Sequence, residues 1–168
     1  MALHFAARNG SADIVEYLID KASEQGQECL ETVLECKNMK SRTPIMESCF
    51  RGYHTTGDKD NASENRLKIV QCLVEAGALP NVCNENTKMT SLHWAAYNGD
   101  DGVVKYLLEY KEIQDDEEVR VVDPYVYSFN GQLPIDVAGH RPAVQCLDAF
   151  LAQFQIENEL PKNKRITD

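Results

Sequence analysis

Histidine and cysteine are the residues of this chain whose side chains could act as general bases, nucleophiles or metal ligands near neutral pH. Two of the four histidines, His4 and His93, occupy the same place in two similar segments. In two further copies of that segment the place is held by Met46 and by Asp136. A shared catalytic role could not survive both changes, so we interpret the repeated histidine as structural.

The cysteines are scattered through apolar stretches. None of them forms a C-x-x-C pair, and their spacing matches neither a disulfide framework nor a zinc site. We interpret them as reduced cysteines of an intracellular protein, with a redox or metal role as the alternative. The six are Cys29, Cys36, Cys49, Cys72, Cys83 and Cys146.

A run of carboxylates at residues 115–118 is the other candidate for chemistry. It lacks the alternating oxygen ligands and the glycine of a calcium loop, so we interpret it as a solvated loop or, alternatively, as a contact for a basic partner. The chain contains no G-x-S-x-G nucleophile elbow and no glycine-rich phosphate loop. The sequence therefore predicts no catalytic residue, no cofactor and no metal.

Charge and hydropathy narrow the class of partner. The formal net charge of the 168 residues is -10, which disfavours nucleic acid and anionic membrane surfaces because both are polyanions. A neutral or basic protein partner fits better, although the acidity could also serve solubility alone. No apolar run is long enough to span a membrane, and the first residues do not form a secretory signal. We expect a cytoplasmic protein with no direct membrane insertion.

Two blocks of sequence recur in alternation and indicate the elements that position these residues. The first block occurs at residues 3–10, 43–52, 92–99 and 134–139. Thr43 and Thr90 stand where a helix N-cap belongs, and Gly10, Gly52 and Gly99 stand where a left-handed residue ends the helix. The second block places apolar pairs on one face of a longer helix. Its pairs are Ile14-Val15 with Leu18-Ile19, Ile69-Val70 with Leu73-Val74, Val103-Val104 with Leu107-Leu108, and Cys146-Leu147 with Phe150-Leu151.

The repeating unit resembles the ankyrin repeat, whose signature is T-P-L-H-x-A-A-x-x-G followed by a V-V-x-x-L-L helix. The resemblance implies an all-α ankyrin-repeat solenoid of stacked helix-turn-helix units with β-turn finger loops, in which the repeated histidine hydrogen-bonds the backbone of the neighbouring loop. We predict an ankyrin repeat domain over residues 1–154, with repeats at 1–37, 38–84, 85–127 and 128–154. Residues 155–168 are polar and are expected to form a tail or linker.

The chain departs from this pattern in the lengths between repeats. The equivalent positions His4, Met46, His93 and Asp136 are 42, 47 and 43 residues apart, whereas the ankyrin period is about 33 residues. We place the surplus in elongated finger connections at 20–37 and 109–128 and in a solvated loop inserted at 53–66. Pro142 stands where the last repeat should have its helix-ending glycine. The first repeat lacks a finger and would expose an apolar edge, so we expect this chain to be a segment of a longer protein.

The resemblance further implies a non-catalytic module that binds a protein partner through its concave face and its fingers. Tyr97 and Phe50 are expected to face that groove, or alternatively to pack on the neighbouring insertion, while Trp94 is expected to wedge between repeats. The predicted partner-binding residues are Met39, Lys40, Arg42, Phe50, Arg51, Asn86, Thr87, Met89, Tyr97, Asn98, Phe129, Asn130 and Gln132.

Four functional settings remain open at this stage. The partner could be a separate protein or another segment of the parent chain. The module could also be the cytoplasmic ankyrin region of a membrane channel or transporter that mediates assembly or gating. It could be a regulatory segment of a larger enzyme, or a structural component of a cytoskeletal or ciliary assembly.

Overall fold

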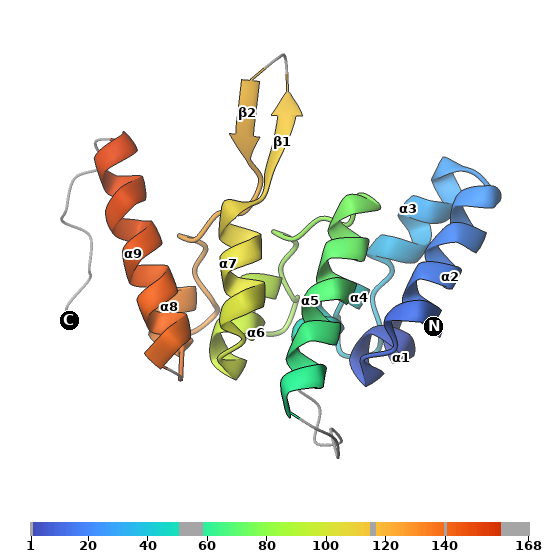
Figure 1. The fold of residues 1–168 in the computed structure, drawn as a ribbon, viewed down its shortest axis with the longest axis horizontal. Helices are drawn as coiled ribbons and strands as arrows, with labels where there is room; N and C mark the ends of the chain where they lie inside the picture. The colour runs from blue at the N-terminus through green and yellow to red at the C-terminus, as the bar shows by residue number, and fades with distance from the viewer. Residues whose placement is uncertain (1, 51–58, 115–116, 140, 159–168) are drawn as a thin grey trace.

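A computed structural model describes residues 2–50, 59–114, 117–139 and 141–158. Within these residues the chain forms helical hairpins that stand side by side in a single row (Figure 1). Each hairpin pairs a short helix with a second helix. The pairs are α1 (Ala2–Asn9) with α2 (Ala12–Glu24), α4 (Pro44–Cys49) with α5 (Lys59–Glu75), α6 (Ser91–Asn98) with α7 (Asp101–Glu109), and α8 (Pro134–Val137) with α9 (Arg141–Asn158).

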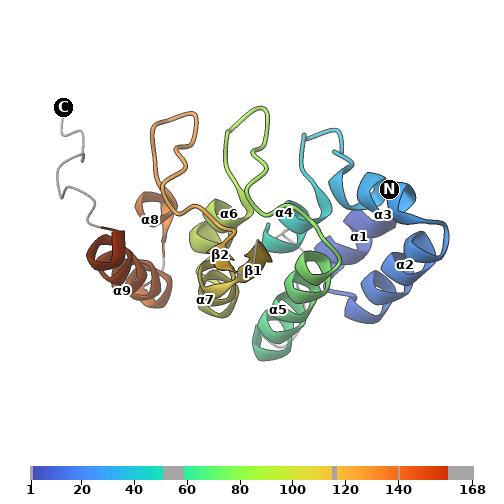
Figure 2. The same ribbon diagram turned by 90° about the horizontal axis from the view of Figure 1, so that it is seen from above.

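The two helices of each hairpin form two layers. Figure 2 shows the short helices α1, α4, α6 and α8 in one layer and α2, α5, α7 and α9 in the other. Three loops project beyond the layer of short helices, and we call them the first, second and third fingers, at residues 36–43, 76–90 and 121–133. The predicted all-α solenoid with finger loops is therefore confirmed.

Local sequence explains where the short helices begin and end. Thr43 and Thr90 are the N-cap residues of α4 and α6, as predicted. Gly10 and Gly99 adopt positive φ angles of 75° and 71° at the helix ends, which an L-residue adopts only at a cost. Gly52 lies outside the described residues.

Stacking buries the apolar pairs of the second helices. Ile69, Val70 and Leu73 on α5 are fully buried, as are Val104 and Leu107 on α7. Each hairpin is too small to enclose its own apolar face, so the burial comes from contact with neighbouring hairpins, which is the main favourable term in the folding of such stacks.

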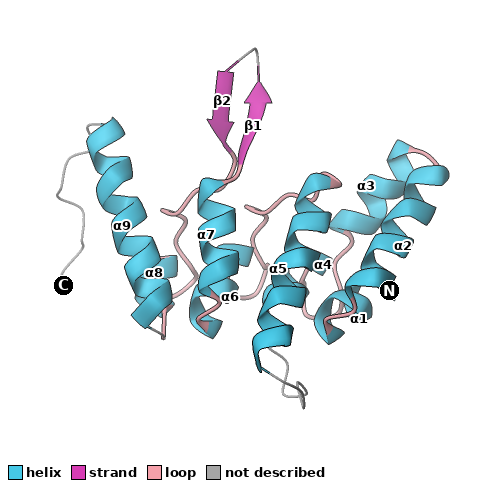
Figure 3. Cartoon of the chain, in the orientation of Figure 1, coloured by secondary structure: helices cyan, strands magenta, loops and turns pink. Residues whose placement is uncertain are grey.

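Two of the three predicted connections have regular structure. The connection at 20–37 is not an extended finger, because α2 continues to Glu24 and a further helix, α3 (Gln27–Glu35), follows. Leu30 and Leu34 of α3 are buried, since their i,i+4 spacing places both on one face of a helix. The connection at 109–128 contains an antiparallel hairpin, β1 (Lys111–Gln114) with β2 (Glu117–Arg120), before it reaches the third finger. Figure 3 shows this hairpin standing clear of the helices.

The predicted loop at 53–66 is wrong in its second half. Helix α5 begins at Lys59, while residues 51–58 lie outside the described part. The polar residues of this stretch are compatible with the first turns of a long helix as well as with a loop, and extending a helix that the core already anchors costs less than starting a new one.

The last repeat also differs in detail. Helix α8 is a single turn, and Pro142 lies in the first turn of α9 rather than at the end of α8. A proline is tolerated there because the first N–H groups of a helix have no intrahelical partner. Helix α9 runs to Asn158, so residues 155–158 of the expected tail are helical, and 159–168 lie outside the described residues.

The hydroxyl groups of the N-cap threonines in the second and third repeats differ in their hydrogen bonding, which yields a matched prediction. Thr90 Oγ1 lies 2.9 Å from Nδ1 of His93. The second repeat has Met46 at the histidine position, and the buried Thr43 Oγ1 has no hydrogen-bond partner among the described residues. We expect Thr90→Val to lower the free energy of unfolding by about 1–2 kcal/mol, and Thr43→Val to change it by less than about 0.5 kcal/mol or to raise it. Urea unfolding of the two variants beside the wild type measures the contrast, and equal losses would contradict it.

Candidate functional site

The repeated histidines bind the fingers. His4 Nε2 lies 2.9 Å from the carbonyl oxygen of Arg42 in the first finger, and His93 Nε2 lies 3.1 Å from that of Gln132 in the third. Nδ1 of His93 accepts a hydrogen bond from the backbone N–H of Thr90 at 3.2 Å, so the ring proton is on Nε2, which donates to the carbonyl. The structural interpretation of these histidines is confirmed.

The environment of His93 makes the stability of the stack depend on pH. Burial lowers the pKa of His93 from its ordinary value of 6.5. The unfolded chain therefore binds more protons than the folded chain just below that pH, so the free energy of unfolding falls as the pH drops through 6.5 toward the folded pKa. One proton contributes at most about 1.4 kcal/mol per pH unit.

The pH effect can be measured by urea unfolding between pH 7.5 and pH 5.5, values chosen to bracket the ordinary pKa of histidine of about 6.5. The variant His93→Asn keeps an amide donor and acceptor but cannot take up a proton. We expect the stability advantage of the wild type over this variant to shrink toward the acid end. A constant advantage across the range would show that His93 does not titrate with folding.

The fingers are tied to one another. Asn84 Nδ2 of the second finger donates to the carbonyl oxygens of Lys40 at 2.7 Å and Ser41 at 2.9 Å in the first. The backbone N–H of Phe129 in the third finger donates to the carbonyl oxygen of Thr87 in the second at 2.8 Å. The three fingers seen in Figure 2 thus form one connected row, held before any partner arrives.

An aromatic cluster joins the second and third repeats. The guanidinium of Arg42 lies 3.7 Å from the centre of the Phe50 ring and 4.6 Å from the Trp94 ring. Trp94 meets Phe50 edge-on at 5.1 Å and Tyr97 at 6.4 Å between ring centres. Glu47 is the ionic partner of Arg42, with Nη1 and Oε1 3.5 Å apart. Trp94 therefore lies between repeats, as predicted.

The predicted binding residues divide into buried or half-buried residues, one residue outside the described part, and exposed residues. Arg42 is buried in the aromatic cluster, and Phe50 packs there on Trp94, half-buried. Asn98 donates to the carbonyl oxygen of Cys49, and Arg51 lies outside the described residues. Thr87 and Met89 are also half-buried. The exposed members are Met39, Lys40, Asn86, Tyr97, Phe129, Asn130 and Gln132.

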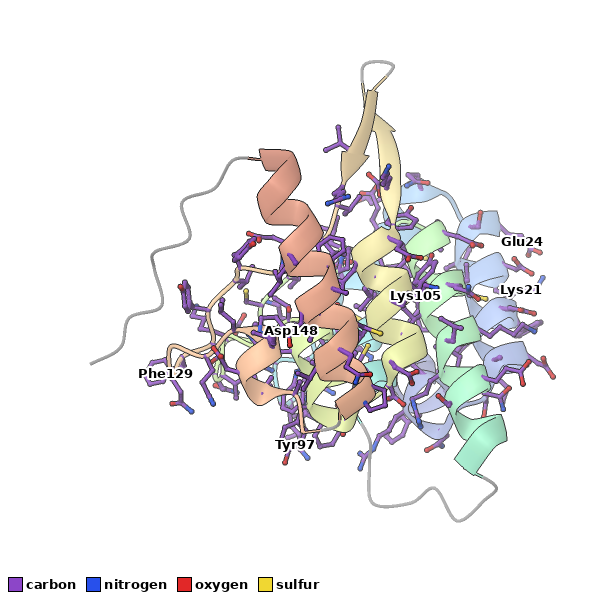
Figure 4. The ribbon with its side chains drawn as sticks, turned by 60° about the vertical axis from the view of Figure 1, so that its left-hand side comes forward. Lys21, Glu24, Tyr97, Lys105, Phe129 and Asp148 are labelled. Carbon is purple, nitrogen blue, oxygen red and sulfur yellow. The ribbon has the colours of Figure 1, made fainter. Side chains whose placement is uncertain are left out.

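The exposed members come from the fingers and from the end of α6. Figure 4 shows Phe129 at the tip of the third finger, on the side opposite Lys21 and Glu24, and Tyr97 at the end of α6. Met39 at the tip of the first finger is fully exposed. We call the seven exposed residues the finger-side surface.

Sequence reasoning missed two exposed apolar residues near the fingers. Leu79 in the second finger and Tyr127 in the third expose half or more of their side chains. Leu79 lies just after the helix-ending Gly77, beyond the apolar pairs of α5. The sequence could have indicated this exposure, because a leucine that lies beyond the end of a helix is not part of the helix's apolar face.

The described residues offer no metal site and no reactive buried thiol. No group of three or more histidine, cysteine, aspartate or glutamate side chains there could hold a metal ion. Burial raises the pKa of the Cys49 thiol to about 12, so this side chain behaves as an apolar residue. No helix in the described ranges is long and apolar enough to cross a membrane.

The comparisons with known proteins agree with this architecture. A family model for ankyrin repeats in three copies matches residues 61–157, and a model for a single ankyrin repeat matches residues 1–25. No curated protein sequence matches the chain significantly. Among solved structures, the ankyrin repeat domain of Bcl-3, a member of the IkappaB protein family, is similar with a TM-score of 0.64 and 19% sequence identity. The match covers 91% of this chain and 56% of that domain, so this chain spans little more than half its length, and the likeness shows the fold alone.

Ankyrin repeats generally serve as protein–protein interaction modules, and the fold is typically not catalytic. The three-copy model covers more than half of the residues, from 61 to 157. The chain belongs to the ankyrin repeat family.

Proposed function

We propose that this chain is a non-catalytic module that binds a protein partner through its finger loops and the adjoining concave face, with the finger-side surface as the contact. The observation that carries the proposal is the row of fingers joined by hydrogen bonds, which presents the exposed Met39 and Phe129, together with the exposed Tyr97 at the end of α6. Large apolar side chains on a rigid scaffold are what a binding hot spot requires.

Rigidity favours binding at this surface because little freedom is lost on association. The fingers are held by the Asn84 side chain and by the His93 bond to Gln132. Tyr97 is supported from behind by the buried Trp94 ring. When a partner binds such a surface, few loops and side chains of this chain must be ordered, so more of the contact energy appears as affinity.

The net charge of -10 favours a neutral or basic partner by electrostatic attraction. We expect a separate protein, or another segment of the same parent polypeptide, in the cytoplasm. Arg42 and Phe50 support the surface from beneath through the aromatic cluster.

Two tyrosines of equal exposure allow a matched test. Tyr97 on the finger side and Tyr17 on α2 each expose 59% of their surface. The chain would be used as bait, the captured protein identified by mass spectrometry, and the purified partner titrated against the wild type and the variants Tyr97→Ala, Phe129→Ala and Tyr17→Ala. We expect Tyr97→Ala and Phe129→Ala each to raise Kd by about 10-fold or more, and Tyr17→Ala to leave Kd unchanged.

The opposite pattern would move the interface. A loss of affinity with Tyr17→Ala alone would place the partner on the α2 side, and the proposed surface would be wrong. Circular dichroism of each variant must match the wild type, so that a lost contact is not confused with a lost fold.

A further inference from the structure

The three fingers stand side by side (Figure 2), and hydrogen bonds through the second finger join their tips. The side chain of Asn84 donates to the carbonyl oxygen of Lys40 at 2.7 Å, and the backbone carbonyl oxygen of Asn84 accepts the N–H of Lys88 at 2.8 Å. The carbonyl oxygen of Thr87 accepts the N–H of Phe129 at 2.8 Å. These bonds hold together four exposed residues, which we call the tip cluster: Met39, Lys40, Lys88 and Phe129.

The two lysines of the tip cluster have no ion-pair partner within the described part of the chain. Glu85, the one acidic residue of the second finger, instead pairs with Lys37 at 2.7 Å and accepts a hydrogen bond from the Ser41 hydroxyl at 3.2 Å. Those two hydrogen bonds lower the pKa of Glu85, and the charges of Lys37 and Lys88 contribute further. The Glu85 carboxylate is therefore already engaged, and Lys40 and Lys88 are available to the carboxylates of a partner.

The acidity of the chain is concentrated elsewhere. Residues 12–35, which span α2 and α3, contain seven carboxylates and one lysine, whereas the first two fingers contain four basic residues and one acidic residue. A segment that contacts the fingers responds mainly to charges within about one Debye length, roughly 8 Å at physiological ionic strength. The net charge of -10 therefore describes the whole molecule and not the tips of its fingers.

Lys88 holds a backbone conformation that favours glycine. Its φ angle is 56°, and the equivalent position of the third finger is occupied by Gly131, with a φ angle of 70°. In both fingers this residue precedes the one whose carbonyl oxygen closes the turn, Met89 in the second and Gln132 in the third. A lysine at such a position carries a conformational cost that glycine avoids. Strain of this kind beside a binding surface points to a use of the side chain.

We propose that the tip cluster binds an acidic segment of the partner that also carries large apolar side chains. The two lysines form ion pairs with the carboxylates of that segment, and Met39 and Phe129 contact its apolar side chains. Charge pairs at the edge of an interface mainly raise the association rate, while large apolar contacts supply most of the affinity. The inference rests on the proposed function, because it names the chemistry of the segment that meets the same finger-side surface. A partner that is neutral overall and acidic only in this segment avoids repulsion by the acidic helices.

A library of random linear peptides displayed on phage tests the proposal, with the full chain as bait. A synthetic peptide of the most enriched sequence is then titrated by fluorescence anisotropy against the wild type and three single variants. Lys40→Glu reverses one charge, and Lys88→Gly removes the other while relaxing the backbone. Lys105→Glu is the matched control, because Lys105 is an exposed lysine on α7 that Figure 4 shows away from Phe129.

We expect the enriched peptides to be acidic and to contain large apolar residues. The Kd of the synthetic peptide should rise by about 5-fold or more in Lys40→Glu and in Lys88→Gly, and should stay unchanged in Lys105→Glu. The affinity should also fall as salt is added, because salt screens exposed charges. The urea midpoint of Lys88→Gly should equal or exceed that of the wild type, since glycine adopts this conformation without strain. A loss of affinity without a loss of stability separates a binding role of Lys88 from a structural one.

Enrichment of neutral or basic peptides, or no enrichment at all, would overturn the proposal. So would a lowered urea midpoint for Lys88→Gly, or an effect of Lys105→Glu on Kd equal to that of the two tip variants. Tyr97→Ala and Phe129→Ala in the same titration distinguish this failure from a failure of the proposed function. If they weaken binding while the lysine variants do not, the finger-side surface binds the partner but its acidic chemistry is wrong. If none of these variants weakens binding, the proposed surface is wrong as well.

Discussion

Replacing Asp100 by alanine is expected to lower the free energy of unfolding by about 3–5 kcal/mol. Asp100 precedes α7, and its Oδ1 lies 2.8 Å from Nη2 of Arg66 on α5. Both side chains are buried. Removing the carboxylate would leave the guanidinium charge in an apolar interface between the second and third repeats, without a counter-ion and largely out of reach of water.

The matched control is an ion pair at the surface. Lys37 Nζ and Glu85 Oε1 are a similar 2.7 Å apart, but both side chains are exposed. Glu85→Ala should therefore cost less than about 1 kcal/mol. Urea unfolding followed by circular dichroism gives both values. Similar losses of unfolding free energy in the two variants would show that burial of the Arg66–Asp100 pair does not make its disruption more costly.

A double replacement separates the charge from the packing. Arg66 Nε and Asp100 Oδ2 are buried without hydrogen-bond partners among the described residues, so the pair only partly offsets its own desolvation. The variant with Arg66→Met and Asp100→Leu is expected to recover most of the stability that Asp100→Ala loses, because no buried charge is left unpaired. A double variant as unstable as Asp100→Ala would contradict this account.

Replacing Trp94 by alanine is the second large effect that we expect, a loss of about 3–5 kcal/mol. The Trp94 ring is buried between the second and third repeats, where it contacts Phe50, Tyr97 and the guanidinium of Arg42. Its removal opens a cavity and takes away one of the two aromatic faces on which the buried Arg42 stacks.

Tyr97→Ala is the control for Trp94→Ala. The Tyr97 side chain is largely exposed, so its removal should lower the free energy of unfolding by less than about 1 kcal/mol. Urea unfolding followed by far-UV circular dichroism measures both variants without relying on the fluorescence of the chain's one tryptophan. A loss below about 1 kcal/mol for Trp94→Ala would show that the aromatic cluster does not couple the repeats. The pair of variants also separates stability, which depends on Trp94, from the binding proposed for Tyr97.

The repeat was predictable because its determinants are local. A threonine cap, a run of small residues, a glycine with positive φ and apolar pairs at helical spacing all act within one hairpin. Their recurrence shows that the hairpins must stack, since none can bury its apolar face alone. The structural role of the histidines could be predicted because Met46 and Asp136 replace them in two copies, and their bond to the neighbouring loop was implied by the resemblance to the ankyrin repeat.

The connections between hairpins were less predictable, because their conformations depend on what they meet. Residues 27–35 and 59–66 are polar enough to form loops. Residues 27–35 nevertheless form helix α3, because Leu30 and Leu34 are buried in the core, and residues 59–66 are helical because α5 extends toward its N-terminus from its buried second half. Composition alone does not distinguish these outcomes when propensities differ by only a few tenths of a kcal/mol per residue.

By itself, the sequence determined the hairpin unit, its number of copies, the structural use of His4 and His93, and the position of Trp94 between repeats. Only the tertiary structure decided which of the predicted binding residues are accessible. Arg42 lies in a finger and Phe50 at the end of a helix, positions that sequence reasoning assigns to the surface, but Trp94 from the next repeat covers both. Such burial arises between residues distant in the chain, and no local pattern encodes it. Ile14 and its identical counterpart Ile69 make the same point, because one is exposed and the other is fully buried although they hold equivalent positions in their repeats.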